Sequence, residues 1–461
     1  MLRFLAYISI IPALLLYAMN QKGSHLGDKI ADLEYFPVMD TGCGACVDES
    51  TEEKIVEDGM LDRVVESMGG ANSQSGTVLV AMSGGVDSSV IPAILTKLGY
   101  KCVGVHMQFW VDDKFNPEDS TEFDKFPENK CCSLESLEHA REIAHKYGMP
   151  FYVLNTRDVF KENIVDDFVE RFAAGVTPNP CIECNRSVKF GFLIQKMHEL
   201  GCEYLATGHY VKVDTKDGIA RLRMATDKLK DQSYFLYTVT EDKLKHCMFP
   251  LAELTKNEVR QIAKEEGLLK VSEKKDSQGI CFFPEKSHVP FLKRHMEPEI
   301  TGANTPGPMR TKDGEDKGEH KGLAFYTIGQ RQGLDIGGPG GPWYVIGKDP
   351  ENNALIVGAN EDLFSQDVHA VKLSFVPNAL PKELLTDEGM PILARLRHRF
   401  TPDDAVLKID NLEDYDPENP QKSFSKLTAT ITYDQPQRAV TPGQSIVFYK
   451  ADEVIGGGII V

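Results

Sequence analysis

Short apolar runs alternate with helical patterns between Thr77 and Tyr210, and this alternation limits the fold more than any other feature. The run TVLVAM (77–82) is typical of a strand that is buried on both faces. SVIPAILTKLG (89–99) then has a helical pattern that ends at a glycine. Similar strand and helix candidates follow in turn at 102–110, 133–148, 151–156, 158–175, 187–201 and 203–210. Such alternation predicts a parallel sheet covered by helices, with ligands bound beyond the carboxyl ends of the strands.

The pattern changes near residue 300, where segments rich in glycine and proline separate short strand candidates. From about residue 366 onward, six short strand candidates with turn signals predict a small antiparallel barrel or sandwich. A chain of 461 residues is expected to hold about three domains. We therefore predict a leader over 1–76, a Rossmann-like α/β domain over 77–298, a small central domain over 299–365 and a C-terminal antiparallel β-barrel over 366–461.

The formal net charge of −18 weighs against a nucleic-acid partner, because phosphate contacts need Lys and Arg. The charge is unevenly distributed, however. Residues 1–76 hold five basic and twelve acidic residues, and residues 111–130 hold three and seven, so these two segments carry −11 of the total. The remaining chain is close to neutral for its size. A nucleic acid therefore stays compatible with the composition, provided that its binding face is local.

The N-terminus carries one arginine and then an apolar run from Phe4 to Met19. This length is typical of a signal-peptide core and short for a membrane span. The alternatives are a buried or interfacial helix, or an artefact of gene prediction. No other segment is long and apolar enough to cross a bilayer, so we expect no membrane association of the mature form. A signal-like start on an acidic leader favours an organelle, plastid or mitochondrion, with the cytoplasm as the alternative.

The segment SGGVDSS (83–89) lies between a predicted strand and a predicted helix. Two adjacent glycines let the backbone approach an anion, and the helix directs its free N–H groups to the same place. Ser83, Ser88 and Ser89 add hydroxyl donors, and Asp87 is suited to position a magnesium ion on a phosphate. A Gly-Gly turn alone is usually structural. The whole heptapeptide in this context predicts a phosphate-binding loop, and the missing Walker A pattern excludes the usual kinase type.

This loop resembles the PP-loop of the ATP-pyrophosphatases, which cleave ATP between the α and β phosphates to adenylate an oxygen. Four further motifs narrow the resemblance: TPNPCIECNRSVKFG (177–191), ATGHY (206–210), KDQSYFL (230–236) and KKDSQGICFFPE (274–285). Together they resemble the tRNA-specific 2-thiouridylases from about Thr77 to the end of the chain. The resemblance leaves out the leader and is weak across 111–130.

The resemblance implies a PP-loop ATP-binding catalytic domain and an enzyme that places sulfur on C2 of the wobble uridine of tRNA. The expected products are 2-thiouridine, AMP and pyrophosphate. It also implies ATP and Mg²⁺ as cosubstrate and cofactor, a central domain that binds tRNA, and a persulfide sulfur-donor protein as partner. The rivals are an amidating PP-loop synthetase, which would use ammonia and need no cysteine, and a non-catalytic relative that binds RNA or metal.

Two cysteines receive catalytic roles from the resemblance. Cys281 becomes the persulfide carrier, and Cys184 becomes the nucleophilic thiol that releases the sulfur by forming a disulfide bond with Cys281. The chemistry is consistent, because adenylation converts the carbonyl oxygen into a leaving group and a persulfide sulfur is acidic and nucleophilic. Taken alone, a cysteine within GICFF is most often a small buried hydrophobic residue.

Cys181 departs from some bacterial members, which carry Asp at this position. Three interpretations stay open: Cys181 lies beside the target base, or joins Cys184 and Cys281 as a ligand of an iron–sulfur cluster, or belongs to a zinc site or spare redox pair. A cluster would conflict with the persulfide mechanism, because the same thiols would be metal ligands. The pairs Cys43/Cys46 and Cys131/Cys132 lie outside the motifs. We interpret the first pair as part of a solvated or processed loop and the second as ordinary thiols.

The resemblance also assigns the remaining site residues. Asp87 counts among the catalytic groups. The nucleotide-binding positions are Ala81, Met82, Ser83, Gly84, Gly85, Val86, Asp87 and Ser88, with Met107 at the adenine and Gly208 beside the nucleotide. The tRNA-binding positions are Asn179, Pro180 and Cys181 at the target base, and His209, Lys230, Asp231, Gln232, Arg397, His398 and Gln444 elsewhere on the tRNA. Taken alone, a histidine such as His209 is more often structural.

A basic pattern in PILARLRHRF (391–400) supports a nucleic-acid partner independently of the resemblance. If this segment is a strand, Arg395, Arg397 and Arg399 share one face and follow a phosphate backbone. The alternative is a solvated strand face. The first interpretation predicts that Arg395→Ala combined with Arg397→Ala weakens tRNA binding and flattens its salt dependence.

Overall fold

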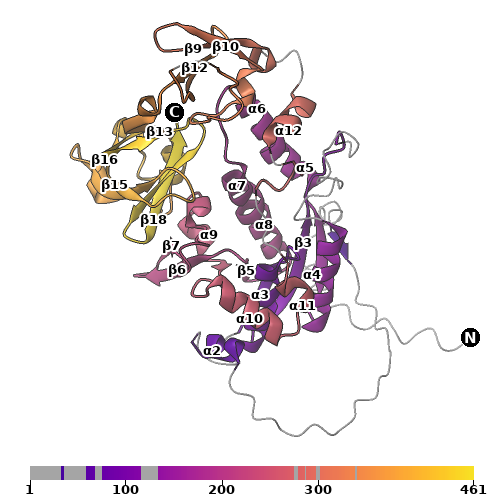
Figure 1. The fold of residues 1–461 in the computed structure, drawn as a ribbon. Coiled ribbons are helices and arrows are strands. Elements are labelled where there is room, and N and C mark those ends of the chain that lie inside the picture. Colours follow the sequence, from indigo (N-terminus) through magenta and orange to yellow (C-terminus); the bar gives the residue numbers. More distant parts are fainter. Residues whose placement is uncertain are drawn as a thin grey trace, which may run out of the picture.

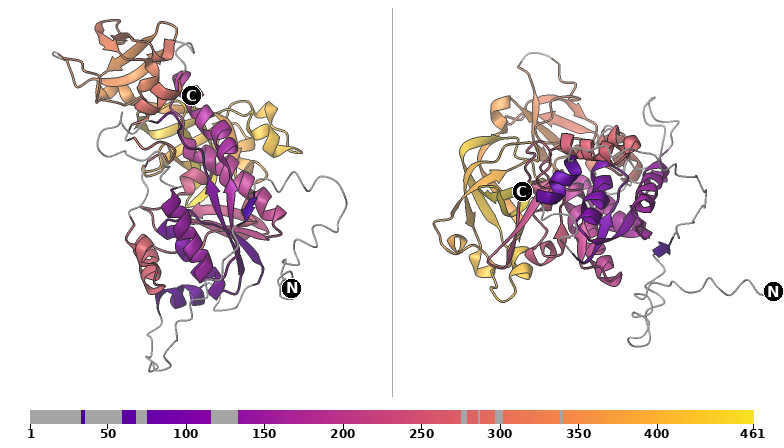
Figure 2. Two further views of the ribbon diagram at one scale, coloured as in Figure 1. Left: turned by 90° about the vertical axis from the view of Figure 1, so that its right-hand side faces the viewer. Right: turned by 90° about the horizontal axis from the view of Figure 1, so that it is seen from below.

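The computed structural model describes 33–35 (backbone only), 59–67, 75–115, 133–274, 279–285, 287–296, 302–337 and 340–461. The apolar N-terminal run and the pairs Cys43/Cys46 and Cys131/Cys132 lie outside these residues. Figures 1 and 2 show a helix-covered sheet domain, a small β domain at one end of the molecule and a barrel beside the sheet domain. Within the described residues, no helix has both the length and the apolar character needed to cross a membrane.

The predicted parallel sheet is confirmed. Its parallel strands are β2 (Thr77–Ala81), β3 (Lys101–Gln108), β4 (Phe151–Asn155), β5 (Tyr204–Ala206) and β8 (Cys247–Met248), in the spatial order β4–β3–β2–β5–β8. Strand β1 (Leu33–Tyr35) pairs antiparallel with β4 at one edge. Val78 and Val80 of β2 pack into one apolar cluster, and Leu79 packs into another on the opposite face. Burial on both faces explains why the three central residues of the strand, 78–80, are all apolar.

Helices cover both faces of the sheet. The cluster that contains Val78 and Val80 includes α3 (Val86–Lys97), α4 (Leu134–Lys146) and α10 (Lys256–Glu265), and the cluster around Leu79 includes α8 (Leu193–Glu199). The predicted helix over 158–175 consists of α5 (Arg157–Phe160), a π-helix (Lys161–Asp166) and α6 (Asp167–Ala173). The helix expected at 187 begins earlier, because α7 (Pro180–Glu183) and a π-helix (Cys184–Phe192) precede α8. The CIEC motif is therefore helical.

Helix α2 (Met60–Ser67) corrects the expectation that residues 1–76 form only a leader. Its apolar positions Leu61, Val64 and Val65 are spaced for one helix face, and all three are buried in the same cluster as α3 and α10. Asp62 also pairs with Lys97 of α3 at 2.6 Å. The last part of the presumed leader therefore belongs to the core of the sheet domain.

The small central domain and the C-terminal barrel follow α12 (His288–His295). The central domain contains β9 (Gly307–Arg310), β10 (Asp316–His320), β11 (Tyr344–Asp349) and β12 (Ala354–Gly358). The barrel contains β13 (Phe364–Phe375), β14 (Met390–Arg395), β15 (Asp403–Ile409), β16 (Ala429–Arg438), β17 (Ser445–Lys450) and β18 (Glu453–Ile460). Pairing of β13 with β18 closes these strands into the predicted antiparallel barrel.

A hairpin that the sequence analysis did not predict joins the sheet domain to the barrel. It consists of β6 (Val211–Lys216) and β7 (Ile219–Met224), and β7 pairs with β18. Ion pairs reinforce this ladder, since Arg223 Nη1 lies 2.7 Å from an oxygen of Asp452. The Asp-Gly turn at 217–218 is a strong hairpin signal that would have revealed it. Backbone hydrogen bonds between β7 and β18 thus connect the barrel to this hairpin of the sheet domain.

Candidate functional site

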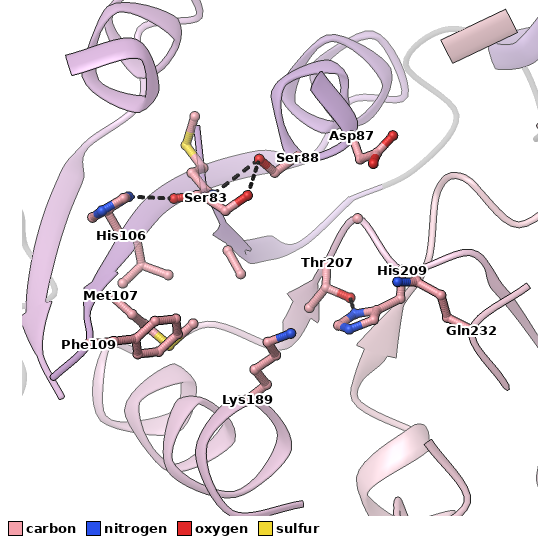
Figure 3. A pocket seen from close by; sticks show the side chains of 14 residues that line it. Ser83, Asp87, Ser88, His106, Met107, Phe109, Lys189, Thr207, His209 and Gln232 are labelled. Atoms are coloured by element: carbon pink, nitrogen blue, oxygen red, sulfur yellow. Dashed lines mark hydrogen bonds between the residues drawn. The ribbon is translucent and has the colours of Figure 1, made fainter. Parts of the chain in front are cut away.

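The predicted phosphate loop lies where β2 ends and α3 begins (Figure 3). Gly84 has a φ of +71°, and a Cβ atom there would lie 2.2 Å from the backbone oxygen of Ser136, so only glycine fits. Ser88 fixes the loop from within, since its Oγ accepts a hydrogen bond from the Ser83 N–H and donates one to the Gly85 carbonyl, both at 3.1 Å. The first N–H groups of α3 open beside this loop, as anion binding requires.

A pocket opens in front of the loop, at the carboxyl ends of β2 and β3 (Figure 3). Its lining consists of Ala81, Met82, Ser83, Asp87, Ser88, Val105, His106, Met107, Phe109, Lys189, Thr207, Gly208, His209 and Gln232. Seven of the expected nucleotide positions are among them, whereas Gly84, Gly85 and Val86 shape the loop behind. A Cβ atom on Gly208 would lie 3.1 Å from the backbone of Asp87 and Ser88, so this close approach favours glycine. Lys189 is a cationic lining residue that the sequence analysis missed.

Asp87 is held by two residues from outside the loop. The ammonium group of Lys256 lies 2.7 and 2.8 Å from its carboxylate oxygens, and the Tyr210 hydroxyl donates to it at 2.8 Å. Lys256 begins α10, which is capped by Thr255 in a capping box. The sequence analysis missed Lys256, because it lies 169 residues from Asp87 and belongs to no recognisable motif.

Two histidines in the pocket wall are held neutral near pH 7. Burial lowers the pKa of His106, whose Nδ1 forms a hydrogen bond of 2.8 Å with the Met82 carbonyl. Burial, followed by the positive charge of Lys189, lowers the pKa of His209 well below its usual value. The Nδ1 of His209 is bonded to the Thr207 hydroxyl at 2.8 Å. The structure therefore places His209 in the nucleotide pocket, whereas we expected it at the tRNA.

Cys184 and Cys281 lie in one apolar cluster although they are far apart in the sequence. Cys184 begins the π-helix and is buried, and Cys281 is a partly buried residue that packs against the same cluster. Met107, which lines the nucleotide pocket, also packs against this cluster. No disulfide bond is formed among the described cysteines. Cys184 and Cys281 thus contact the same apolar cluster, which also reaches the pocket through Met107.

Cys181 differs from Cys184 in its surroundings. It is exposed on α7, whereas the neighbouring Pro180 is buried and Asn179 caps the helix with an extended backbone. In the parts of the chain that the structure describes, no three His, Cys, Asp or Glu side chains gather to hold a metal ion. The geometry therefore gives no support to a three-cysteine ligand set.

Comparison with known proteins decides the family. Residues 76–285 match the family model "tRNA methyl transferase HUP domain", and residues 290–359 match the model "tRNA methyl transferase PRC-barrel domain". Residues 420–460 match the model "Aminomethyltransferase beta-barrel domain". The tRNA-specific 2-thiouridylase MnmA 1 of Caldanaerobacter subterraneus subsp. tengcongensis is 40% identical over 83% of this chain and 97% of its own length. The MnmA of Clostridium acetobutylicum is also 40% identical, over 83% and 99%.

The chain belongs to the tRNA-specific 2-thiouridylase family. Among solved structures, the tRNA thiolase NcsA of Methanococcus maripaludis, solved with its iron–sulfur cluster, is 16% identical over 48% of this chain and 67% of its own. Its TM-score of 0.29 is too low to carry an argument about the present chain.

In this member of the 2-thiouridylase family, Gln444 of the barrel holds the loop that precedes Cys181. Its amide nitrogen donates to the carbonyls of Thr177 at 2.8 Å and Pro178 at 3.1 Å. The Thr177 N–H in turn donates to the Pro442 carbonyl at 2.9 Å. Gln444 was expected at the tRNA, and the structure gives its amide a second task, which is to position the loop.

Asp231 also differs from the expectation for this 2-thiouridylase. Its side chain is 1% exposed, and its Oδ2 accepts hydrogen bonds from Arg395 at 3.1 Å and the Ser233 hydroxyl at 2.8 Å. The Ala225 N–H donates to its other oxygen at 3.0 Å. The carboxylate therefore joins the barrel to the sheet domain instead of facing solvent, while the adjacent Lys230 is partly exposed.

The predicted row of three arginines on one strand face is wrong. Strand β14 ends at Arg395, which is buried, so the alternation does not continue through the following turn. Arg397 donates to the Ala439 carbonyl at 2.9 Å and to the Thr441 hydroxyl at 3.1 Å, and Arg399 alone is exposed. His398 bonds the Asp231 carbonyl at 2.8 Å. Arg395, Arg397 and His398 therefore bond other parts of the protein, whereas Arg399 is exposed to solvent.

Proposed function

We propose that this protein is an ATP-dependent tRNA-uridine 2-sulfurtransferase that converts the wobble uridine to 2-thiouridine. The observation that carries the proposal is an apolar cluster that contains Cys184, packs against Cys281 and shares Met107 and Phe109 with the lining of the phosphate-loop pocket. The curated relatives carry the same activity in their names. The matching family model is described by methyl transfer, but that reaction needs neither this loop nor a pair of cysteines.

The loop is suited to bind the phosphates of ATP as a substrate. The Ser83 hydroxyl and the N–H groups at the start of α3 would donate to phosphate oxygens, and the backbone at Met107 would meet the adenine. The space that a Cβ atom on Gly208 would fill supports this fit. Mg²⁺ would be held by Asp87 and would neutralise charge on the leaving pyrophosphate. Because Lys256 already bonds both oxygens of Asp87, Mg²⁺ would compete with this lysine for the carboxylate.

Sulfur transfer would follow adenylation of the C2 oxygen. The terminal sulfur of a Cys281 persulfide, after losing its proton, attacks C2, and the C2–O bond to AMP breaks. The Cys184 thiolate then attacks the sulfur of Cys281, and the bond to the transferred sulfur breaks. That sulfur gains the electron pair and remains on C2 as the thione, while the two cysteines are oxidised to a disulfide. An external thiol must reduce this disulfide before the next turnover.

A persulfide-donor protein is part of the proposal, because Cys281 must be recharged with sulfur after each cycle. The partial exposure of Cys281 supports such access. We also propose an organellar location, supported by the acidic, signal-like N-terminal sequence. Fusion of residues 1–76 to a fluorescent reporter tests the location, and a purely cytoplasmic signal would contradict it.

One experiment tests the proposed activity. The protein is incubated with ATP, Mg²⁺, a persulfide donor and unmodified tRNA, and 2-thiouridine is measured by mass spectrometry. We expect product with the wild type and none with Cys184→Ser or Cys281→Ser. The control is Cys202→Ala, a buried cysteine of another cluster that should retain activity. Full activity in either serine variant, or pyrophosphate release that is stimulated by ammonia and not by tRNA, would overturn the proposal.

A further inference from the structure

A buried ionic network lies beside the apolar cluster that contains Cys184 and packs against Cys281, which is called the cysteine cluster below. None of the residues in this network has been assigned a role in the reaction. Its centre is Asp112, whose side chain is 1% exposed. One carboxylate oxygen accepts hydrogen bonds from Arg294 at 2.6 and 3.1 Å, and the other is bonded to His295 at 2.8 Å. Arg294 also donates to Glu285 with its remaining terminal nitrogen. One guanidinium group therefore bridges two carboxylates.

Opposite charges face each other in this network, because the Arg294 guanidinium group lies between the carboxylates of Asp112 and Glu285. Burial alone would raise the pKa of Asp112, but the hydrogen bonds from His295 and Arg294 outweigh it and lower the pKa. Arg294 is 21% exposed, and its guanidinium group lies over the ring of Phe115 at 5.2 Å. A planar donor group with five N–H bonds can serve two carboxylates at once, which lysine cannot do. The network is thus specific for arginine at this position.

The network joins three parts of the chain that the reaction needs. Asp112 follows β3, whose end supplies Met107 and Phe109 to the nucleotide pocket. Glu285 lies four residues after Cys281, in a segment that is neither helix nor strand. Arg294 belongs to α12, which packs into the cysteine cluster. The segment 279–285 has no helix or strand hydrogen bonds of its own. Its position therefore depends on side-chain anchors.

Two kinds of anchor hold this segment. The rings of Phe282 and Phe283 are buried in the apolar cluster, and they fix its depth. Apolar contacts have no preferred direction, so these rings fix the orientation of the segment less sharply than a hydrogen bond does. The bond from Arg294 to Glu285 is directional and ties the segment to Asp112, four residues after the end of β3. This bond therefore contributes to where Cys281 lies relative to the pocket.

We propose that Arg294 is a positioning residue for sulfur transfer, which holds the Cys281 segment against the strand that carries the nucleotide pocket. The inference rests on the proposed function, because only a sulfur carrier needs such alignment with an activated base. It concerns the transfer step alone. Adenylation uses the phosphate loop, which the network does not touch.

The test compares Arg294→Met, which removes both bonds, with Glu285→Ala, which releases the Cys281 segment and leaves the Asp112–Arg294 pair. Glu285→Gln keeps an acceptor for the guanidinium group and is the conservative rescue. Lys270→Met, which breaks an exposed ion pair with Glu142, is the matched control. Two rates are measured, namely tRNA-dependent pyrophosphate release and 2-thiouridine formation. Thermal denaturation of each variant is recorded in parallel.

We expect 2-thiouridine formation to fall at least tenfold in Arg294→Met and Glu285→Ala, with pyrophosphate release within threefold of the wild type. Glu285→Gln should retain most of the activity. If Arg294→Met does not fold, Glu285→Ala decides alone. Equal loss of both rates, or unchanged thiouridine formation in Glu285→Ala, would overturn the proposal.

A third measurement separates this inference from the proposed function. The stability of the Cys184–Cys281 disulfide is measured in equilibrium with glutathione, which requires neither tRNA nor ATP. We expect the effective concentration of the two thiols to drop at least tenfold in Glu285→Ala and not in Lys270→Met. If the wild type makes no 2-thiouridine but the disulfide responds in this way, the proposed function and the role in sulfur transfer fail, whereas the positioning of Cys281 relative to Cys184 by this network stands.

Discussion

The ammonium group of Lys256 bonds both carboxylate oxygens of Asp87, at 2.7 and 2.8 Å, and thereby fastens the first residue of α10 to the phosphate loop. The Asp87 side chain is 34% exposed, so solvent and cations reach it from the pocket side. A carboxylate expected to hold Mg²⁺ thus already has a protein counter-ion. If Mg²⁺ binds Asp87 as proposed, it competes with Lys256 for the same carboxylate, and this competition can be measured.

Replacing Lys256 by methionine should therefore destabilise the protein and increase its response to Mg²⁺. Asp87 loses its counter-ion, and we expect a loss of about 1–3 kcal/mol, less than for a fully buried pair because Asp87 is partly solvated. Millimolar Mg²⁺ should then raise the melting temperature of Lys256→Met more than that of the wild type. Thermal denaturation with and without Mg²⁺ measures both effects. An equal Mg²⁺ response in the two proteins would show that the competition does not occur.

The two glycines of the phosphate loop should respond differently to alanine. Gly84→Ala places a Cβ atom 2.2 Å from the Ser136 carbonyl at a φ of +71°, so the loop must move and ATP affinity should fall at least tenfold. Gly85→Ala meets only the Ser83 hydroxyl at 3.6 Å, in an extended conformation that alanine adopts freely. Calorimetric titration with ATP measures the difference. Similar affinities for the two variants would refute the steric account.

Arg395 should matter for stability more than for tRNA affinity. Arg395→Ala leaves the buried Asp231 carboxylate without its counter-ion, and we expect a loss of about 3–5 kcal/mol in the free energy of unfolding. Arg399→Ala, at an exposed position, should change it by less than about 0.5 kcal/mol. Urea denaturation measures both. A double variant Asp231→Leu with Arg395→Met should recover part of the loss, and no recovery would argue against an ionic cause.

Gln444→Ala should loosen the loop in front of Cys181. The loop loses two hydrogen bonds from the amide, worth about 1–2 kcal/mol together. Hydrogen exchange at the Thr177 N–H should accelerate, because this group bonds the neighbouring Pro442 carbonyl. Gln444→Glu should be more harmful, since a carboxylate would face two carbonyl oxygens. Unchanged exchange in both variants would mean that the barrel does not hold the loop.

His288 should make stability depend on pH. Burial, and then the positive charge of Lys348, lower the pKa of His288 to about 4, while an unfolded histidine titrates near 6.5. Between these two pKa values the unfolded chain binds a proton at this histidine and the folded protein does not. The free energy of unfolding therefore decreases as the pH falls from about 6.5 towards 4, by at most about 3 kcal/mol. His288→Phe keeps the stacking on Phe172 and should flatten this slope. The exposed His145→Phe is the control, and equal slopes in both variants would contradict the assignment.

Local patterns predicted the phosphate loop and the sheet well. SGGVDSS carries its own strand, turn and helix signals, so its conformation follows from neighbours in the sequence. The strand at 77–82 and the barrel strands were predicted equally well. A strand buried on both faces is a continuous apolar run, and a strand buried on one face alternates apolar and polar residues.

Residues that act across long sequence separations were not predictable in this way. Lys256 and Arg294 look like ordinary surface residues of helices, and only the fold brings them to Asp87 and Asp112. The prediction that three arginines share one strand face was wrong for a related reason. Alternation alone does not show where a strand ends, and β14 ends at Arg395. Burial of Asp231 is likewise a property of the interface between domains, and no local pattern reports it.

The ladder between β7 and β18 has a consequence for how the protein is made. The ribosome completes the nucleotide-binding sheet and its hairpin long before it reaches β18. Until then β7 has no neighbour at the edge that β18 will cover, and an open strand edge invites pairing with other chains. A strand that is synthesised late therefore covers the edge of one synthesised much earlier, and a chain that stops short of β18 leaves this edge open to pairing with other chains.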